Sequence, residues 1–407
     1  MRGPTKTRPV YCRGMAGARV QLGLERLLED PALVKGRRVT VLANQASVTS
    51  RLEPAWQALT RAGVDVVRIF APEHGLWGLA QDMEAVGETH EPVLGVPAVS
   101  LYGATPETLT PTPEQLAGVD AVVADLPDIG CRYYTFAATL AHVMAACERA
   151  GAEVIVCDRP NPLGGLMLEG GPVEPACRSF VSELPTPVRH GMTLGELALL
   201  LRAQRHPELS LAVLTCAGWR REMWWDETGL PWVAPSPNMP TPLSAAIYPG
   251  ACLVEATNLS EGRGTTRPFQ LVGAPWLAAD ELARRLNTLA LPGVWFRATR
   301  FRPEFGKHAG KVCHGVEWHV VDRAALRPLA TGVRLLAEAC ALHPTEFAWR
   351  AAPYEFVADV PAIDLLTGSP AARAVIEGRS EIGALLDAWH LYCERFSALR
   401  SEFLLYT

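Results

Sequence analysis

The segment Pro72-Glu73-His74-Gly75 combines a carboxylic acid, an imidazole and a turn-forming glycine. A glutamate on such a turn can protonate a leaving oxygen if an apolar neighbour keeps the carboxyl protonated near neutral pH. Trp77 follows the turn closely enough to provide that shield. A solvated turn with a helix-capping glutamate is the alternative, and this segment alone does not decide between the two.

A second cluster, between Asp125 and Tyr134, contains two carboxylates, a guanidinium and two tyrosines. Arg132 can bind a carboxylate through two parallel hydrogen bonds, and the tyrosines can pack on sugar faces. A structural ion pair between an aspartate and Arg132 explains the same residues equally well. The candidates in this cluster are Asp125, Asp128, Arg132, Tyr133 and Tyr134.

A third polar segment runs from Asn258 to Phe269 and is interrupted by glycines. It lacks both the spacing of a P-loop and a G-x-G-x-x-G pattern. We interpret it as a loop that offers Glu261, together with Arg263 or Arg267, to a substrate. Two proline-locked segments carry further candidate ligands, and the remaining candidates in these three segments are Arg159, Asn161, Asn238 and Thr265.

Short apolar runs in the sequence predict the strands and helices that position most of these residues. The runs 38–43, 64–70, 96–101, 121–125 and 154–158 are predicted strands, and helices are predicted at 54–62 and 135–150. Near-continuous apolar strands that alternate with helices indicate a parallel sheet covered on both faces. Ligands bind such sheets at the carboxyl ends of the strands, which is where the polar side chains fall. These side chains are Asn44, Glu73, Asp125, Asp128, Arg132, Asp158, Arg159 and Asn161. His74, next to Glu73, is a further candidate for substrate binding.

The pattern changes in the second half. Thr193 and Glu196 form a capping box for a helix at 193–205, and 211–215 is a further strand. We interpret 232–249 as a proline-rich loop and place a domain boundary near 245–275. Helices are then predicted at 278–291, 328–342 and 380–399, and strands at 295–301 and 315–321.

Composition limits the function classes. The chain has 407 residues and a net charge of −5, which suits two α/β domains and gives no basic surface for nucleic acid. Ten cysteines without a C-x-x-C pair are typical of a reduced, cytoplasmic protein, although the even number leaves a few disulfides open. No signal peptide or membrane-spanning run is visible, and Met15 is an alternative start. The histidines have no metal-site spacing, so we expect neither a metal nor a cofactor, and oligomeric state stays open.

In combination, these segments resemble the bacterial exo-β-N-acetylmuramidases, a family long known only as a conserved domain of unknown function. The resemblance covers about residues 21–407. Its most specific stretches are Phe70 to Gly75, Asp158 to Gly165, His190 to Glu196, Pro235 to Pro240 and Thr257 to Phe269. Pro127 stands where the family usually has glutamine, and Ala362-Ile363-Asp364 varies a Phe-Asp pattern.

The resemblance implies a Rossmann-like N-terminal domain, a smaller α/β C-terminal domain and an active cleft between them. We place the domains at 18–250 and 251–407. It also implies release of N-acetylmuramic acid from the non-reducing end of peptidoglycan fragments during cell-wall turnover. The proposed catalytic glutamate of the family falls on Glu73.

The mechanism follows as a hypothesis. Glu73 protonates the leaving oxygen, and a second group stabilises the oxocarbenium-like centre or activates water. Glu261 is the first candidate for that group, followed by Asp125 and Asp128, or the 2-acetamido group of the substrate serves as nucleophile. Arg132, Arg263 and Arg159 are candidates for the lactyl carboxylate. A sugar-binding protein without hydrolysis, or a phosphate- or nucleotide-dependent enzyme using residues 258–269, are the alternative classes.

Overall fold

The computed structural model describes residues 19–407, so the alternative start at Met15 and the predicted first domain residue, 18, lie outside the described residues. A seven-stranded sheet forms the first part of the fold, in the order β3-β4-β2-β1-β5-β6-β7. Its pairs are parallel except for β3 with β4. The strands are β1 (Arg38–Leu42), β2 (Asp65–Ala71), β3 (Thr89–His90), β4 (Pro97–Ser100), β5 (Ala121–Ala124), β6 (Glu153–Cys157) and β7 (Leu211–Leu214).

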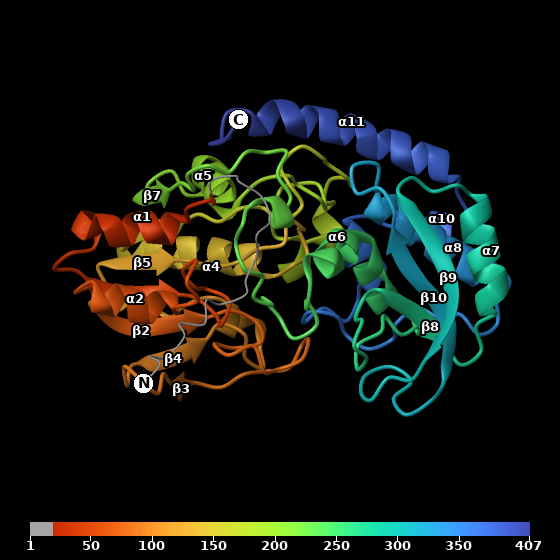
Figure 1. The fold of residues 1–407 in the computed structure, drawn as a ribbon, viewed down its shortest axis with the longest axis horizontal. Helices are drawn as coiled ribbons and strands as arrows, with labels where there is room; N and C mark the ends of the chain where they lie inside the picture. Colours follow the sequence, from red (N-terminus) through yellow and green to blue (C-terminus); the bar gives the residue numbers. More distant parts are fainter. Residues whose placement is uncertain (1–18) are drawn as a thin grey trace, which may run out of the picture.

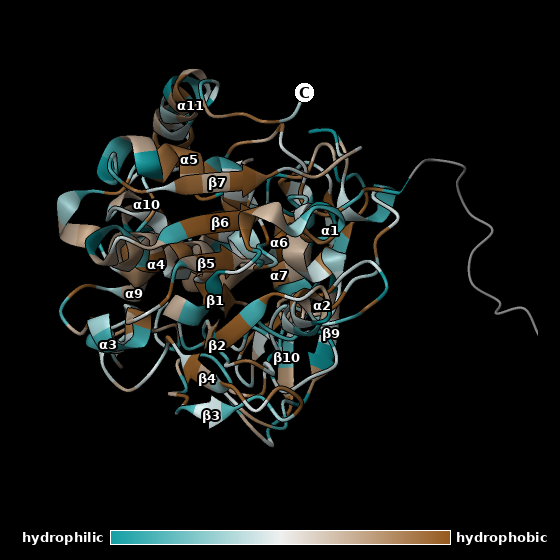
Figure 2. Ribbon diagram, turned by 90° about the vertical axis from the view of Figure 1, so that its left-hand side faces the viewer, coloured by the Kyte–Doolittle hydropathy of each residue, from teal (hydrophilic) through white to brown (hydrophobic). Residues whose placement is uncertain are grey.

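Helices cover both faces of this sheet because its central strands are apolar on both sides. Val41 and Val123 belong to a core with helices α1 (Gly23–Glu29) and α2 (Ala55–Arg61). The alternate residues Leu42 and Val122 belong to a core with α4 (Phe136–Ala150) and α5 (Leu194–Arg205). The hydrophobic colouring of β5, β6 and β7 in Figure 2 follows this burial. The predicted doubly covered parallel sheet is confirmed.

A three-stranded antiparallel sheet, in the order β8-β10-β9, forms the centre of the second part (Figure 1). Its strands are β8 (Leu271–Ala274), β9 (Val294–Phe301) and β10 (Cys313–Val320). The helices that accompany it are α6 (Pro242–Ala251), α7 (Ala279–Thr288), α8 (Pro328–Leu342), α9 (Ala362–Thr367), α10 (Ala371–Ile376) and α11 (Ile382–Arg400). No helix within residues 19–407 is both long enough and apolar enough to cross a membrane.

The predicted proline-rich loop at 232–249 is wrong in its second half, where α6 begins at Pro242. Thr241 caps this helix by accepting a hydrogen bond from the backbone amide of Ser244. Proline suits the first position of a helix because its missing amide hydrogen would be unpaired there in any case. Pro249 lies in the last turn, and the chain continues as a short 3-10 helix, Cys252–Ala256. The remaining short 3-10 helices span Pro31–Leu33, Pro106–Leu109, Pro175–Cys177, Phe180–Ser182 and Trp225–Glu227, and α3 spans Pro113–Leu116.

The predicted capping box is confirmed at the start of α5, where Thr193 and Glu196 bond reciprocally. The same threonine donates its hydroxyl to Asp158, 2.7 Å away, at the end of β6. Asp158 also accepts the hydroxyl of Tyr406 at 2.6 Å. Tyr406 in turn accepts a bond from the Cys216 amide at 2.9 Å. The C-terminal residues are therefore fastened to the carboxyl ends of two strands of the sheet.

Loss of these hydrogen bonds should weaken the fold. We expect Tyr406→Phe to lower the free energy of unfolding by about 1–3 kcal/mol, because it leaves Asp158 and the Cys216 amide short of a partner in a buried site. Burial already raises the pKa of Asp158 to about 6. Urea unfolding measures the effect. Tyr392→Phe is the matched control, since that hydroxyl donates a long bond of 3.4 Å to Pro185, and the two variants should not lose equal stability.

Candidate active site

A pocket lies between the two parts of the fold. We call it the inter-domain pocket. Residues of the N-terminal sheet and its loops line one side, and residues that follow α6 line the other. Its lining comprises Glu73, His74, Asp82, Tyr133, Tyr134, Thr135, Ser236, Tyr248, Glu255, Arg263, Phe269, Tyr354 and Glu355.

Glu73 enters this pocket from the carboxyl end of β2. Its side chain is 5% exposed, and each carboxylate oxygen accepts a hydrogen bond. The Met83 amide donates to Oε1 at 3.1 Å, and the Thr135 hydroxyl donates to Oε2 at 2.7 Å. Glu73 is thus held in one orientation by a loop and by the start of α4.

Trp77 does not shield Glu73, contrary to the prediction. Its side chain is 43% exposed and packs edge-on against Trp56, with ring centroids 5.8 Å apart. The turn itself explains the outcome, because His74 and Gly75 both have positive φ angles, 72° and 75°, and turn the chain sharply after Glu73. Trp77 therefore lies outside the pocket lining.

Glu355 is a second buried glutamate in the same pocket and comes from the C-terminal part. It accepts the hydroxyl of Tyr102 at 2.8 Å. Burial, followed by the negative charge of Glu73, raises the pKa of Glu355 well above its usual range. Burial, followed by the negative charge of Glu73, also raises the pKa of Tyr102. Glu355 thus lines the same pocket as Glu73, with its pKa raised.

Strained backbone conformations occur in the lining of the inter-domain pocket. His74, Phe269 and Glu355 line the pocket with φ angles of 72°, 65° and 47°, in the left-handed region that non-glycine residues rarely adopt. Phe356, next to Glu355, has a φ angle of 68°. Such conformations cost about 1–3 kcal/mol each and cluster where a site fixes its side chains.

Arg263 is the cation of the inter-domain pocket, and three carboxylates surround it. Its guanidinium lies 2.5 Å from Glu255, 3.3 Å from Glu261 and 3.4 Å from Asp82. It also lies over the ring of Phe269, 5.0 Å from the centroid. Arg263 therefore has carboxylate partners from within the protein.

The two glutamates beside Arg263 differ in proton affinity. Burial raises the pKa of Glu255, whose other oxygen accepts the Tyr354 hydroxyl at 2.7 Å. Burial also opposes the charged form of Glu261, but the charges of Lys307 and Arg263 outweigh it and lower the pKa of Glu261. Lys307 lies 3.0 Å from Glu261. Glu261 is thus held as the charged partner of two cations and lies outside the pocket lining.

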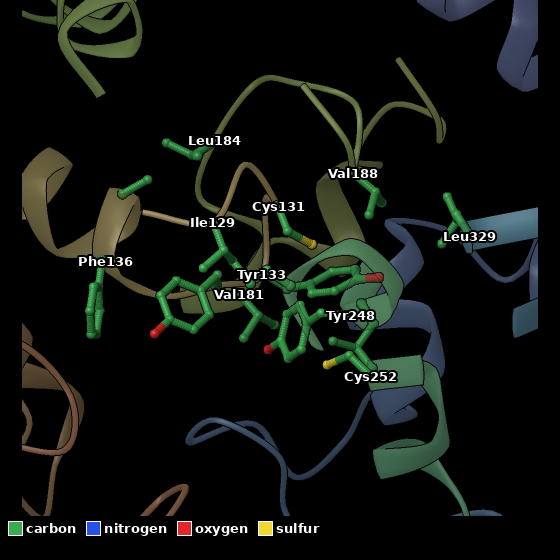
Figure 3. Packing of buried hydrophobic residues seen from close by; sticks show 14 of the residues in the cluster. Ile129, Cys131, Tyr133, Phe136, Val181, Leu184, Val188, Tyr248, Cys252 and Leu329 are labelled. Carbon is green, nitrogen blue, oxygen red and sulfur yellow. The ribbon is translucent and has the colours of Figure 1, made fainter. Parts of the chain in front are cut away.

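Aromatic rings form part of the pocket wall. The rings of Tyr133 and Tyr134 each lie 5.8 Å from the ring of Tyr248, and Tyr248 lies 4.9 Å from Phe269. Figure 3 shows Tyr133 and Tyr248 next to one another in the core that joins the two parts of the fold. The hydroxyl of Tyr133 donates to the carbonyl of Pro249. Tyr133, through its contacts with Tyr248 and Pro249, therefore also connects the N-terminal part to α6.

The structure places Arg132 outside the pocket. Its guanidinium is buried and donates to the carbonyl oxygens of Gly171, Thr186 and Leu366 at 2.7–3.0 Å. These three segments come from different parts of the chain, so Arg132 joins loops instead of facing a substrate. Thr265 also acts within the protein, donating to the Gly262 carbonyl at 2.6 Å.

Asp125 and Arg159 form a buried bidentate ion pair. Nε and Nη2 of Arg159 donate to the two carboxylate oxygens of Asp125 at 2.6 and 2.8 Å. Asp128 lies near them, and neither aspartate lines the inter-domain pocket. The hypothesis that Asp125 or Asp128 is the second catalytic group therefore finds no geometric support. Asp125 is instead neutralised by Arg159, and Asp128 accepts a hydrogen bond from the Gly130 amide at 2.6 Å.

The three asparagines predicted as ligands bond within the protein. Asn44 donates to the Pro235 carbonyl at 2.8 Å, and Asn161 donates to the Met192 carbonyl at 3.0 Å. Asn238 donates to the Gln81 side chain at 2.8 Å. Asn44 and Asn238 thus hold the 232–239 loop, whose Ser236 lines the pocket.

Sequence reasoning missed several residues of the pocket. None of them directly follows a predicted strand, and they are Asp82, Glu255, Tyr354 and Glu355. The one usable signal was a carboxylate between two aromatic residues in Tyr354-Glu355-Phe356. Within residues 19–407, no group of three or more His, Cys, Asp or Glu side chains has the arrangement of a metal site.

Glycoside hydrolases act through a pair of carboxyl groups, and Glu73 and Glu355 are two buried carboxyls that line one pocket. The fold and site thus define a two-domain α/β enzyme of that class. A family model described as exo-β-N-acetylmuramidase NamZ, N-terminal, matches residues 39–243, and the corresponding C-terminal model matches 246–406. The chain belongs to this family.

Curated and solved relatives agree with the family assignment. The chain is 40% identical to the peptidoglycan β-N-acetylmuramidase NamZ of Bacillus subtilis (strain 168), over 95% of this chain and 92% of that protein. Two DUF1343 family proteins of Bacteroides fragilis NCTC 9343 have similar crystal structures. One has a TM-score of 0.84 and 34% identity, and the other 0.75 and 27%, each covering 96% of this chain and 99% of its own.

Proposed function

We propose that the chain is an exo-acting glycoside hydrolase that releases N-acetylmuramic acid from the non-reducing end of peptidoglycan fragments. The observation that carries this proposal is the buried pair Glu73 and Glu355, contributed by opposite sides of the inter-domain pocket. A walled pocket accepts the end of a sugar chain, whereas an internal cut needs an open groove. The activity of the Bacillus subtilis relative supports the substrate.

The environments of the two glutamates suggest their roles. In this proposal Glu355 carries the proton and protonates the leaving oxygen, in place of the Glu73 acid expected from the sequence. Its burial beside the Glu73 charge keeps the acid form populated. Glu73, whose two oxygens both accept hydrogen bonds, works as the carboxylate on the anomeric carbon. It attacks that carbon, activates a water or orients the 2-acetamido group.

Hydrolysis of a β-N-acetylmuramide tests the function directly. We expect turnover of MurNAc-β-1,4-GlcNAc with release of both monosaccharides, and far slower turnover of a disaccharide with N-acetylglucosamine at the non-reducing end. Proton NMR of the first-formed anomer separates inversion, in which Glu73 activates a water, from retention, in which Glu73 attacks or orients the 2-acetamido group. Binding of the disaccharide with no product after prolonged incubation would contradict the proposal and favour a binding protein.

Arg263 is the proposed partner of the lactyl carboxylate, because it is the arginine of the sequence-based candidates that lines the inter-domain pocket. We expect Arg263→Gln to reduce the preference for a muramide over a glucosaminide by about 10- to 100-fold in kcat/KM, the value of one charged hydrogen bond. Arg267→Gln is the matched control, since Arg267 pairs with Glu317 at a half-exposed position. An unchanged preference in Arg263→Gln would exclude this contact.

A further inference from the structure

The inter-domain pocket is closed in this structure. Its free space is about 30 Å³, which is room for about one water molecule. Pockets that hold small molecules usually offer about 300–1,000 Å³. A sugar can therefore reach Glu73 and Glu355 only after part of the lining has moved.

Residues 79–86, which we call the covering segment, are loosely fastened. They form neither a helix nor a strand, and Leu79, Glu84 and Ala85 are exposed. The segment nevertheless reaches the inter-domain pocket, because Asp82 lines it and the Met83 amide donates to Glu73. Segments with few buried contacts open at a low cost in free energy. The covering segment is therefore the part of the lining that we expect to move.

The polar contacts of the covering segment with the C-terminal part are weak. Oδ1 of Asp82 lies 3.4 Å from Nη1 of Arg263, which is longer than the usual 2.7–2.9 Å of a charge-assisted hydrogen bond. Nη2 of Arg350 donates to the Met83 sulfur at 3.8 Å. Thioether sulfur is a poor acceptor, so the ion pair of Asp82 is the stronger of the two contacts.

The nitrogens of the Arg263 guanidinium each face a different carboxylate. Nη1 faces Asp82, while Nη2 lies 2.5 Å from Glu255 and Nε lies 3.3 Å from Glu261. Each of the two glutamates also has a second side-chain partner and is only 5–6% exposed. Asp82 is 27% exposed, and Arg263 is its one charged side-chain partner among residues 19–407. Of the three carboxylates, Asp82 is thus the one that an incoming carboxylate can replace at the lowest cost.

We propose that the covering segment is a lid, that Asp82 latches it to Arg263, and that the lactyl carboxylate of a muramic acid residue releases it by taking the place of Asp82. Nη1 of Arg263 then exchanges one carboxylate for another. A ligand shifts a conformational equilibrium only by its differential affinity for the two states, and here the open state is the one with a free Nη1. This inference rests on the proposed function, because the competing carboxylate belongs to the proposed substrate.

The affinity of Asp82→Asn for N-acetylmuramic acid tests the competition, by titration calorimetry with the full chain. We expect binding about three- to tenfold tighter than in the parent, because the internal competitor for Arg263 has lost its charge. A merely structural role of Asp82 predicts weaker binding instead. Glu84→Gln is the matched control, since it removes the same charge from an exposed position of the covering segment and should keep the parental affinity.

Hydrogen exchange of the backbone amides in residues 79–86, measured without any ligand, tests the latch itself. The Met83 amide is protected by its bond to Glu73 while the lid is closed. We expect exchange about threefold faster or more in Asp82→Asn and in Arg263→Gln. The double variant should exchange no faster than the faster single variant, because either substitution already removes the same ion pair.

Several results would overturn the latch. They are affinity of Asp82→Asn equal to or below that of the parent, absence of binding by both proteins, exchange unchanged in both single variants, and effects that add in the double variant. The exchange measurement needs no substrate and judges the latch separately from the activity. Failure of the parent to hydrolyse the disaccharide would contradict the proposed function, whatever the exchange rates.

Discussion

Glu73→Gln should lose at least about a thousandfold in kcat/KM on a chromogenic β-N-acetylmuramide, while its fold is retained. The amide has nearly the shape of the carboxyl, so the contacts of Glu73 with Met83 and Thr135 can persist. What disappears is the negative charge and basicity at the anomeric carbon, and a catalytic carboxylate or base is worth a factor of about 10²–10⁴ or more. Initial rates under single-turnover conditions measure the loss.

The control for this variant lies on the same loop. Glu84 is exposed and accepts a hydrogen bond from the Gln81 amide, and Glu84→Gln makes the same chemical change outside the inter-domain pocket. It should retain parental turnover. Turnover by Glu73→Gln within a fewfold of the parent would remove Glu73 from the reaction, whatever its place in the pocket.

Glu355→Gln should lose about 10²- to 10⁴-fold on the disaccharide, which has a poor leaving group, and much less on a muramide of an acidic nitrophenol. A nitrophenolate leaves without protonation, so only the disaccharide needs the acid. Glu73→Gln should lose activity on both substrates. A loss by Glu355→Gln that is equal on the two substrates would contradict the acid role and point to a structural one.

The pH dependence gives a second readout for Glu355. An acid catalyst must be protonated, so parental kcat/KM should fall as pH rises through the raised pKa of Glu355, and this basic limb should be missing in Glu355→Gln. Stability follows the same sign. The folded protein holds the Glu355 proton more tightly than the unfolded chain, so this contribution to stability is complete below the unfolded pKa and is lost as pH rises through the folded one. Unfolding of the variant should show less of that decline.

The N-terminal sheet could be predicted because local patterns decide it. Apolar runs at strand length, the threonine and glutamate of the α5 capping box, and polar residues at strand ends all act over a few residues. Pro242 misled the interpretation, because proline marks loops and helix starts alike. The site was only partly predictable for a different reason. Its position after a predicted strand indicated that Glu73 belongs to the site. The distance between two strand ends, however, depends on strand order, which sequence patterns do not contain.

The arginines show the same limit. Arg132, Arg159 and Arg263 each have an aspartate or glutamate within four residues in the sequence. In the structure they bind carbonyl oxygens, one aspartate and a group of three carboxylates, respectively. Their partners come from distant segments, so their roles follow from tertiary packing. Glu355 could not be predicted as a site residue for the same reason. Its hydrogen bond to Tyr102 and its raised pKa beside Glu73 both depend on residues in the other part of the chain.

The bond between Glu355 and Tyr102 has a consequence for how this enzyme evolves. Each part of the fold supplies one of the two proposed catalytic carboxyls, so neither part has a chemical function for selection to preserve by itself. A substitution that loosens the contact between the parts reduces turnover even when it lies far from any sugar. Selection for catalysis therefore also preserves the contact between the two parts of the fold. The two halves of the gene are expected to be inherited together and to resist separation by recombination.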